Sequence, residues 1–182
     1  ALGLTEADGP GIDVLLPAVP HLRGLIAERT KDWPMPVHII DGEADKFRAF
    51  RIARAALAAS GTVTLELGIA GTPMVVAYRV DPVAAQLKFL VKVPSIVLAN
   101  LVLEAQAFPE FVQEDCRPDR LAAALAEIIR DGPARDRQLA ALARLREKMA
   151  TSGATPSDTA ADIVLGYADA GRAGSNRANT TR

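Results

Sequence analysis

The residues with the clearest chemical potential are a small-residue turn, Ser60-Gly61-Thr62, and an acid four residues later, Glu66. Hydroxyls and backbone N–H groups at the start of a helix hold a diphosphate, because that end carries partial positive charge and glycine allows close approach. A carboxylate about one turn further can accept hydrogen bonds from ribose hydroxyls. A plain Ser/Thr cap followed by a solvated acid explains the same residues, and on spacing alone it is the better explanation.

This turn matches none of the common local motifs. The chain has no G-x-x-x-x-G-K phosphate loop and no G-x-G-x-x-G dinucleotide turn. It is also not a G-x-S-x-G nucleophile elbow, because Ala58 stands where the first glycine is required.

Four further polar residues are candidates for the same site. Arg79 and Asn100 each follow an apolar run, at the strand end where open α/β sheets bind ligands. Arg79 is suited to a phosphate and Asn100 to a sugar or phosphate, although a surface arginine and a turn cap are the alternatives. Gln113 and Glu114 precede a helix and are predicted to face the same cleft, although capping of that helix explains the segment as well.

Composition excludes several classes of protein. The 182 residues are 49% hydrophobic and 24% charged, which is ordinary for one globular domain. Basic and acidic residues number 21 and 22, so the net charge of −1 argues against a nucleic-acid binder. A single cysteine, Cys116, excludes an internal disulfide and is interpreted as a packed thiol. The two histidines, His21 and His38, are far apart, so no metal site is expected.

Neither a secretion signal nor a membrane span is predicted. The opening residues lack a charged-then-apolar order. The most apolar stretch, 82–103, is interrupted by Lys88, Lys92, Pro94 and Asn100. Because the chain begins with Ala1 in what reads as a loop, we expect it to be part of a longer protein.

The elements that must position the candidate residues follow from hydrophobic periodicity. Strands are predicted over 12–16, 37–40, 55–59, 74–77 and 95–98, and helices over 20–29, 45–54, 62–69, 82–91, 118–130, 133–149 and 156–167. Alternating strands and helices predict an α/β domain over 1–170 with a Rossmann-like parallel sheet, covered in part by the helical C-terminal third. Residues 171–182 have no large apolar side chain and are predicted to be a disordered tail.

Longer sequence motifs are more informative than the turn alone. They are Val19-Pro20-His21-Leu22, Asp41-Gly42-Glu43-Ala44-Asp45-Lys46, Ala58-Ala59-Ser60-Gly61-Thr62-Val63-Thr64-Leu65-Glu66, Gly71-Thr72-Pro73-Met74-Val75-Val76-Ala77-Tyr78-Arg79, Leu90-Val91-Lys92-Val93-Pro94 and Pro109-Glu110-Phe111-Val112-Gln113-Glu114-Asp115-Cys116. In this order, over 19–167, the chain resembles the C-terminal half of the bacterial lipid-A-disaccharide synthases. Several motifs in sequence are far more specific than a lone glycine-rich turn.

The resemblance implies a GT-B glycosyltransferase with two Rossmann-like domains. Its partners would be UDP-2,3-diacylglucosamine and 2,3-diacylglucosamine 1-phosphate, which it joins into the β-1,6 lipid A disaccharide with release of UDP. No metal and no cofactor beyond this UDP-sugar donor substrate are implied. The enzyme would be a cytoplasmic protein, peripheral on the inner face of the inner membrane, since both substrates carry acyl chains. A homodimer through this half is an option that the resemblance allows.

Carried over by position, the resemblance assigns UDP contacts within this chain and no catalytic residue. Ser60, Gly61 and Thr62 would meet the diphosphate and Glu66 the ribose; the same pocket would include Arg79, Asn100, Gln113 and Glu114.

The chain departs from the family pattern in two respects. The N-terminal half is absent, and with it the acceptor site, the catalytic acid and a G-S-R phosphate motif expected just upstream of Leu4, so the fragment is expected to be inactive alone. Glu104-Ala105-Gln106 also stands where Gly-Arg is expected near 104–105.

Two other hypotheses stay open. One is a different GT-B protein that uses UDP-GlcNAc, such as a murein-precursor glucosaminyltransferase or a 2-epimerase. The other is a non-catalytic, truncated α/β module, which predicts no nucleotide binding at all.

Overall fold

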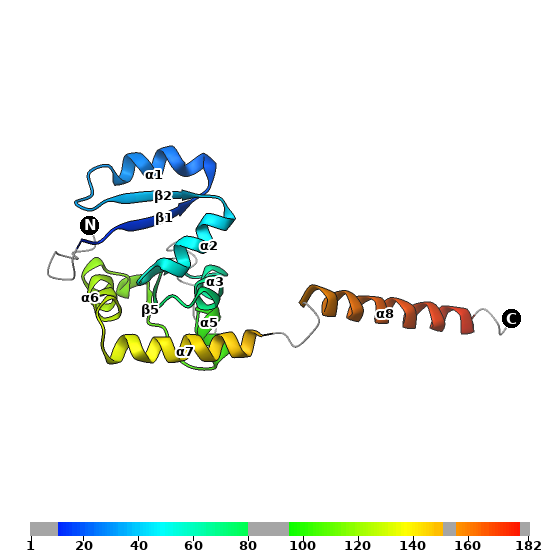
Figure 1. Ribbon diagram of the computed structural model, residues 1–182. Coiled ribbons are helices and arrows are strands. Elements are labelled where there is room, and N and C mark those ends of the chain that lie inside the picture. Colours follow the sequence, from blue (N-terminus) through cyan, green and yellow to red (C-terminus); the bar gives the residue numbers. More distant parts are fainter. Residues whose placement is uncertain (1–10, 80–94, 151–155, 179–182) are drawn as a thin grey trace. The chain divides into compact units, whose positions relative to one another are not determined.

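A computed structural model describes residues 11–79, 95–150 and 156–178 (Figure 1). The chain divides into two compact units, Ala1–Lys148 and Met149–Arg182. All five strands among the described residues belong to the first unit, and the second contributes one long helix.

The strands are β1 (Val14–Ala18), β2 (Val37–Asp41), β3 (Ala56–Ala59), β4 (Met74–Tyr78) and β5 (Glu110–Val112). The α-helices are α1 (Arg23–Thr30), α2 (Glu43–Ile52), α3 (Val63–Ala70), α5 (Leu98–Leu103), α6 (Pro118–Ile129), α7 (Pro133–Met149) and α8 (Pro156–Ala178). Two short 3-10 helices, η2 (Pro20–Leu22) and η4 (Gln113–Asp115), precede α1 and follow β5.

Every strand pairing in the described residues is parallel, which confirms the predicted α/β class. Strands β1 and β2 form one pair, with Val14 opposite Val37 and α1 packed against β2 (Figure 1). The other sheet has the order β3-β4-β5, with β4 in the centre. Parallel neighbours need crossover connections, and α1 lies in the connection between β1 and β2, whereas α3 lies in the connection between β3 and β4.

The core lies on both faces of β4. Met74 and Val76 pack into a cluster built from α3, α5 and α7, whereas Val75 packs against α6 on the opposite face. Successive side chains of a strand point to opposite faces, so a strand covered on both sides must be apolar throughout. The continuous run Met74-Val75-Val76-Ala77 satisfies this requirement.

The strand predicted at 95–98 is wrong, because α5 begins there at Leu98. The N–H of Val97 bonds to the Ser95 hydroxyl at 2.9 Å, and the N–H of Ile96 bonds to Glu110 Oε2 at 3.0 Å. Side-chain acceptors thus replace the partner strand that would have paired these backbone donors.

Other differences are smaller. Strand β1 continues through Pro17, which lacks an N–H and is tolerated in a strand with an open edge. Strand β5 has only three residues and was not predicted. Helix α8 continues to Ala178, past its predicted end at 167 and into the segment assigned to a tail. The helix predicted at 82–91 lies outside the described residues.

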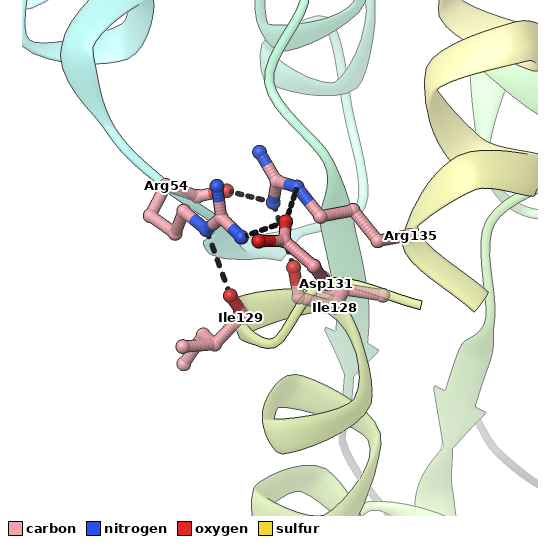
Figure 2. A network of polar contacts seen from close by, with 5 residues as sticks. All are labelled: Arg54, Ile128, Ile129, Asp131 and Arg135. Atoms are coloured by element: carbon pink, nitrogen blue, oxygen red, sulfur yellow. Dashed lines mark hydrogen bonds and ion pairs between the residues drawn. The ribbon is translucent and has the colours of Figure 1, made fainter. Parts of the chain in front are cut away.

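A network of two arginines closes the turn between α6 and α7 (Figure 2). Arg135 donates to the carbonyls of Ile128 and Arg54, each at 2.7 Å. Arg54 donates to the carbonyl of Ile129 at 2.7 Å and pairs with Asp131. These contacts satisfy the last carbonyls of α6 and join them to the chain entering β3.

Candidate functional site

Three of the predicted site segments follow three neighbouring strands. Ser60 comes directly after β3, Arg79 directly after β4 and Gln113 directly after β5. Because these strands are adjacent and parallel, their carboxyl ends share one edge of the sheet. This is the edge at which open α/β sheets bind ligands.

The turn between β3 and α3 is built around Gly61, whose φ of +143° is a conformation that side-chain-bearing residues rarely adopt. Neither neighbouring hydroxyl caps the helix. Thr62 makes no side-chain cap bond, and Ser60 Oγ donates to the carbonyl of Ile96 at 2.6 Å. Thr64, fully buried, donates to the carbonyl of Gly61 at 2.9 Å and so fixes the shape of the turn. The plain Ser/Thr cap is therefore not realised at Ser60 or Thr62.

Glu66 lies on the first turns of α3 with its side chain 29% exposed. Its Oε2 is 3.0 Å from Lys46 Nζ, and Lys46 also contacts Glu43 at 2.8 Å. Hydrogen bonds to the carboxylates of Glu43 and then Glu66 raise the pKa of Lys46 above its ordinary value. The acid is thus balanced by a lysine that stays charged throughout the neutral range.

Arg79 and Gln113 are in direct contact at the ends of β4 and β5. Arg79 Nε donates to the carbonyl of Gln113 at 3.4 Å, and the guanidinium is exposed. Gln113 has a φ of +53°, a left-handed conformation that is uncommon for a residue with a side chain. Such strain occurs often at binding sites. Glu114 follows within η4 and is exposed.

Asn100 is only 2% exposed, and its amide group is fully engaged. Its Oδ1 accepts from the backbone N–H groups of Ala107 and Phe108 at 3.0 and 2.9 Å. Its Nδ2 donates to the carbonyl of Phe108 at 2.9 Å and to Glu110 Oε1 at 2.8 Å. The side chain therefore ties α5 to the segment that leads into β5.

Two residues important to this geometry were not predicted. Lys46 occurs in a charged segment that looks like a solvated loop, and Glu110 precedes an apolar pair. Glu110 accepts hydrogen bonds from Ser95 and Asn100 and from the N–H of Ile96, whose own carbonyl accepts from Ser60. A run of hydrogen bonds thus links Glu110 to the turn after β3. Only the contacts, which span many residues in sequence, reveal this link.

Other candidate chemistry is limited. Cys116 packs beside the core cluster that includes Val75, as predicted for a structural thiol. Within the described ranges, no group of three His, Cys, Asp or Glu side chains is arranged to hold a metal ion. In the same part of the chain, no helix has the length and apolarity needed to cross a membrane.

Comparison with known proteins identifies the family. A sequence model described as lipid-A-disaccharide synthetase matches residues 5–164. The chain belongs to the lipid-A-disaccharide synthetase family. It is 51% identical over 167 residues to the lipid-A-disaccharide synthase of Rhodopseudomonas palustris strain BisB18, covering 91% of this chain and 42% of that protein.

Two further relatives carry the same name. The synthase of Bradyrhizobium diazoefficiens is 49% identical over 173 residues, covering 94% of this chain and 44% of the relative. The synthase of Paramagnetospirillum magneticum is 37% identical over 166 residues, covering 90% of this chain and 42% of the relative. The chain therefore spans less than half the length of the curated relatives that it matches.

The family departure at Glu104 has a structural counterpart. Glu104 caps the end of α5 with a φ of +54°, the left-handed conformation that glycine adopts most easily. The left-handed backbone at this position thus explains why a glycine is expected here. Lys148 donates to the carbonyl of Val102 at 2.9 Å and lies 4.0 Å from Glu104.

Proposed function

We propose that this chain is the UDP-binding half of a lipid-A-disaccharide synthase. The whole enzyme would transfer 2,3-diacylglucosamine from UDP to 2,3-diacylglucosamine 1-phosphate, forming the β-1,6 disaccharide and releasing UDP. The observation that carries the proposal is the common sheet edge at which Ser60, Arg79 and Gln113 follow β3, β4 and β5, in a chain of this family.

The turn at 60–62 would bind the diphosphate. Its backbone N–H groups lie at the start of α3 and are not capped by the hydroxyls of Ser60 or Thr62. Gly61 leaves room for a phosphate oxygen. Arg79 lies on the neighbouring strand end and would supply a positive charge. Donors aimed at a diphosphate stabilise the charge that grows on it as the sugar leaves, so the same contacts would assist transfer.

The remaining predicted residues take supporting and recognition roles. Glu66 would accept hydrogen bonds from the ribose, and Gln113 with Glu114 would border the pocket. For Asn100 we propose an indirect role, since direct contact with UDP would require it to give up bonds that hold the segment before β5.

Location and assembly belong to the same proposal. The acylated substrates would bring the whole enzyme to the cytoplasmic face of the inner membrane as a peripheral protein. The acceptor site and catalytic acid would lie in the rest of the protein, so this chain by itself should form no disaccharide. Incubating it with both lipid substrates and analysing the products tests that expectation.

Calorimetric titration of this chain with UDP is the first test, beside Glu66→Ala and the control Glu127→Ala, which changes an exposed acid on α6. The proposal is supported if Glu66→Ala weakens UDP binding about tenfold or more and Glu127→Ala leaves it unchanged. The expected size follows because hydrogen bonds to charged groups contribute about 1.5–3 kcal/mol. A folded parent chain that does not bind UDP favours the non-catalytic module instead.

The donor sugar separates the enzymatic alternatives. We expect a full-length relative containing this half to use the diacylated UDP-glucosamine and to ignore UDP-GlcNAc. Turnover of the unacylated donor would favour the murein-precursor type of transferase or an epimerase.

A further inference from the structure

The contact between Lys46 and Glu66 joins two helices that are consecutive in the fold. Lys46 lies near the start of α2, which follows β2, and Glu66 lies near the start of α3, which follows β3. The two helices pack against each other, and the Nζ–Oε2 distance is 3.0 Å. Side-chain exposure is 19% for Lys46 and 29% for Glu66, so this ion pair is shielded more than a typical surface pair.

The ammonium group of Lys46 is held from several sides. Glu43, one turn earlier on α2, contacts Nζ at 2.8 Å. The ring centroids of Phe47 and Phe50 lie 4.9 and 6.0 Å from Nζ, and Phe50 belongs to the buried core. Cation–π attraction and the second carboxylate therefore restrict the lysine without help from Glu66. A cation fixed in this way can impose one orientation on the carboxylate that it meets.

We propose that Lys46 is a positioning residue for Glu66, holding one carboxylate oxygen so that the other is presented to the ribose hydroxyls of the nucleotide. This inference rests on the proposed UDP site. It assigns Lys46 no contact with the nucleotide, because its ammonium group is already surrounded by two carboxylates and two rings. A carboxylate has two acceptor oxygens, so engagement of Oε2 leaves Oε1 for the ligand.

The alternatives make different predictions for two ligands. If Lys46 acts through Glu66, its loss weakens binding only when the ribose hydroxyls are present. If Lys46 instead contacts the phosphates, UDP and 2′,3′-dideoxy-UDP are weakened alike. If it only stabilises the packing of α2 on α3, thermal unfolding changes and the preference for the ribose does not.

The experiment is calorimetric titration of this chain with UDP and with 2′,3′-dideoxy-UDP, each at the same salt concentration. We expect the parent to prefer UDP by about tenfold to a hundredfold, the range given by hydrogen bonds to a charged group. Lys46→Met should reduce that preference by about tenfold while the affinity for dideoxy-UDP is unchanged. Glu66→Gln should reduce the preference similarly, and Lys46→Arg should restore part of it.

The matched control comes from the same helix. Arg48→Met removes an exposed cation that pairs with Asp45 at 2.8 Å, and it should keep the preference of the parent. Circular dichroism establishes that each variant is folded, and Lys46→Gln carries the same expectation as Lys46→Met if the latter does not fold.

Each outcome decides the inference. A preference for UDP that survives Lys46→Met overturns it while leaving the UDP site intact. Equal weakening of both ligands also overturns it, in favour of a phosphate contact. A folded parent that binds neither ligand overturns the proposed site and this inference together.

Discussion

Gly68 lies where α3, the helix that carries Glu66, meets α7. A β-carbon added at Gly68 would lie 2.3 Å from Leu145 Cδ2 and 3.6 Å from its Cγ. Leu145 is fully buried among the core side chains, so its methyl group has little room to move. Gly68→Ala therefore tests whether the two helices approach each other as closely as the structure has them.

Two effects of Gly68→Ala oppose each other. Alanine in place of glycine within a helix stabilises it by about 0.5–1 kcal/mol. Forcing an extra methyl group into a packed core costs about 1–3 kcal/mol. We expect a net loss of about 1–2 kcal/mol in the free energy of unfolding. In a Leu145→Ala background the clash is gone, so the same substitution should become stabilising by up to about 1 kcal/mol.

Urea denaturation followed by circular dichroism measures both changes. Gly24→Ala on α1 is the matched control, because nothing lies within 4 Å of its added β-carbon, and it should stabilise or be neutral. If Gly68→Ala stabilises the parent chain as Gly24→Ala does, or if the Leu145→Ala background leaves its effect unchanged, α3 and α7 do not approach each other this closely at Gly68.

Three further predictions concern other parts of the first unit. Arg135→Met should lower the free energy of unfolding by about 2–3 kcal/mol in urea denaturation, because it removes charged donors from two backbone carbonyls. A loss below about 0.5 kcal/mol, as expected for a surface substitution, would contradict this. Glu104→Gly should leave the free energy of unfolding unchanged or raise it by up to about 1 kcal/mol, since glycine adopts the positive φ of this position without strain. Glu127→Gly within α6 should instead lower it by about 1 kcal/mol. Equal losses in the two variants would argue against a left-handed conformation at Glu104. The pKa of Lys46 is higher in the folded than in the unfolded chain, so the stability that its charge contributes is fully present below pH 10.5 and is lost as pH rises through the folded pKa. The difference in the free energy of unfolding between the parent and Lys46→Met should therefore be constant from neutral pH to about pH 9.5 and shrink above 10.5. A difference that grows above pH 10.5 would contradict the assignment.

The pattern of apolar residues located most of the elements correctly. Helix α7 has the bounds predicted for it, α6 ends one residue before its predicted end, and β4 extends its predicted strand only by Tyr78. These segments have strong periodicity or a continuous apolar run, which are local properties. The segment 95–98 looked like a strand for the same reason, but its backbone donors are satisfied by Ser95 and Glu110 and not by a neighbouring strand. No local pattern contains that information.

The candidate site was predictable to the same extent. The order of strands and turns was enough to expect Ser60 and Arg79 at one edge of a parallel sheet, and the strand order agrees. Gln113 was expected to face the same cleft, but the strand that places it there, β5, was not predicted. That Asn100 is buried and engaged with Phe108 and Glu110 was not predictable, since an asparagine after an apolar run is equally suited to a turn.

The α/β class, the family and the positions of the turn residues follow from the amino-acid sequence, because periodicity, glycine placement and extended motifs are local features of the chain. The contact of Lys46 with Glu66, and the link from Glu110 through Ile96 to Ser60, come from the packing of distant segments. The contacts from Lys46 to Glu66, from Glu110 to Ile96 and from Ile96 to Ser60 join residues 20, 14 and 36 positions apart, and the energy of an ion pair or a buried hydrogen bond depends on distance and burial in space.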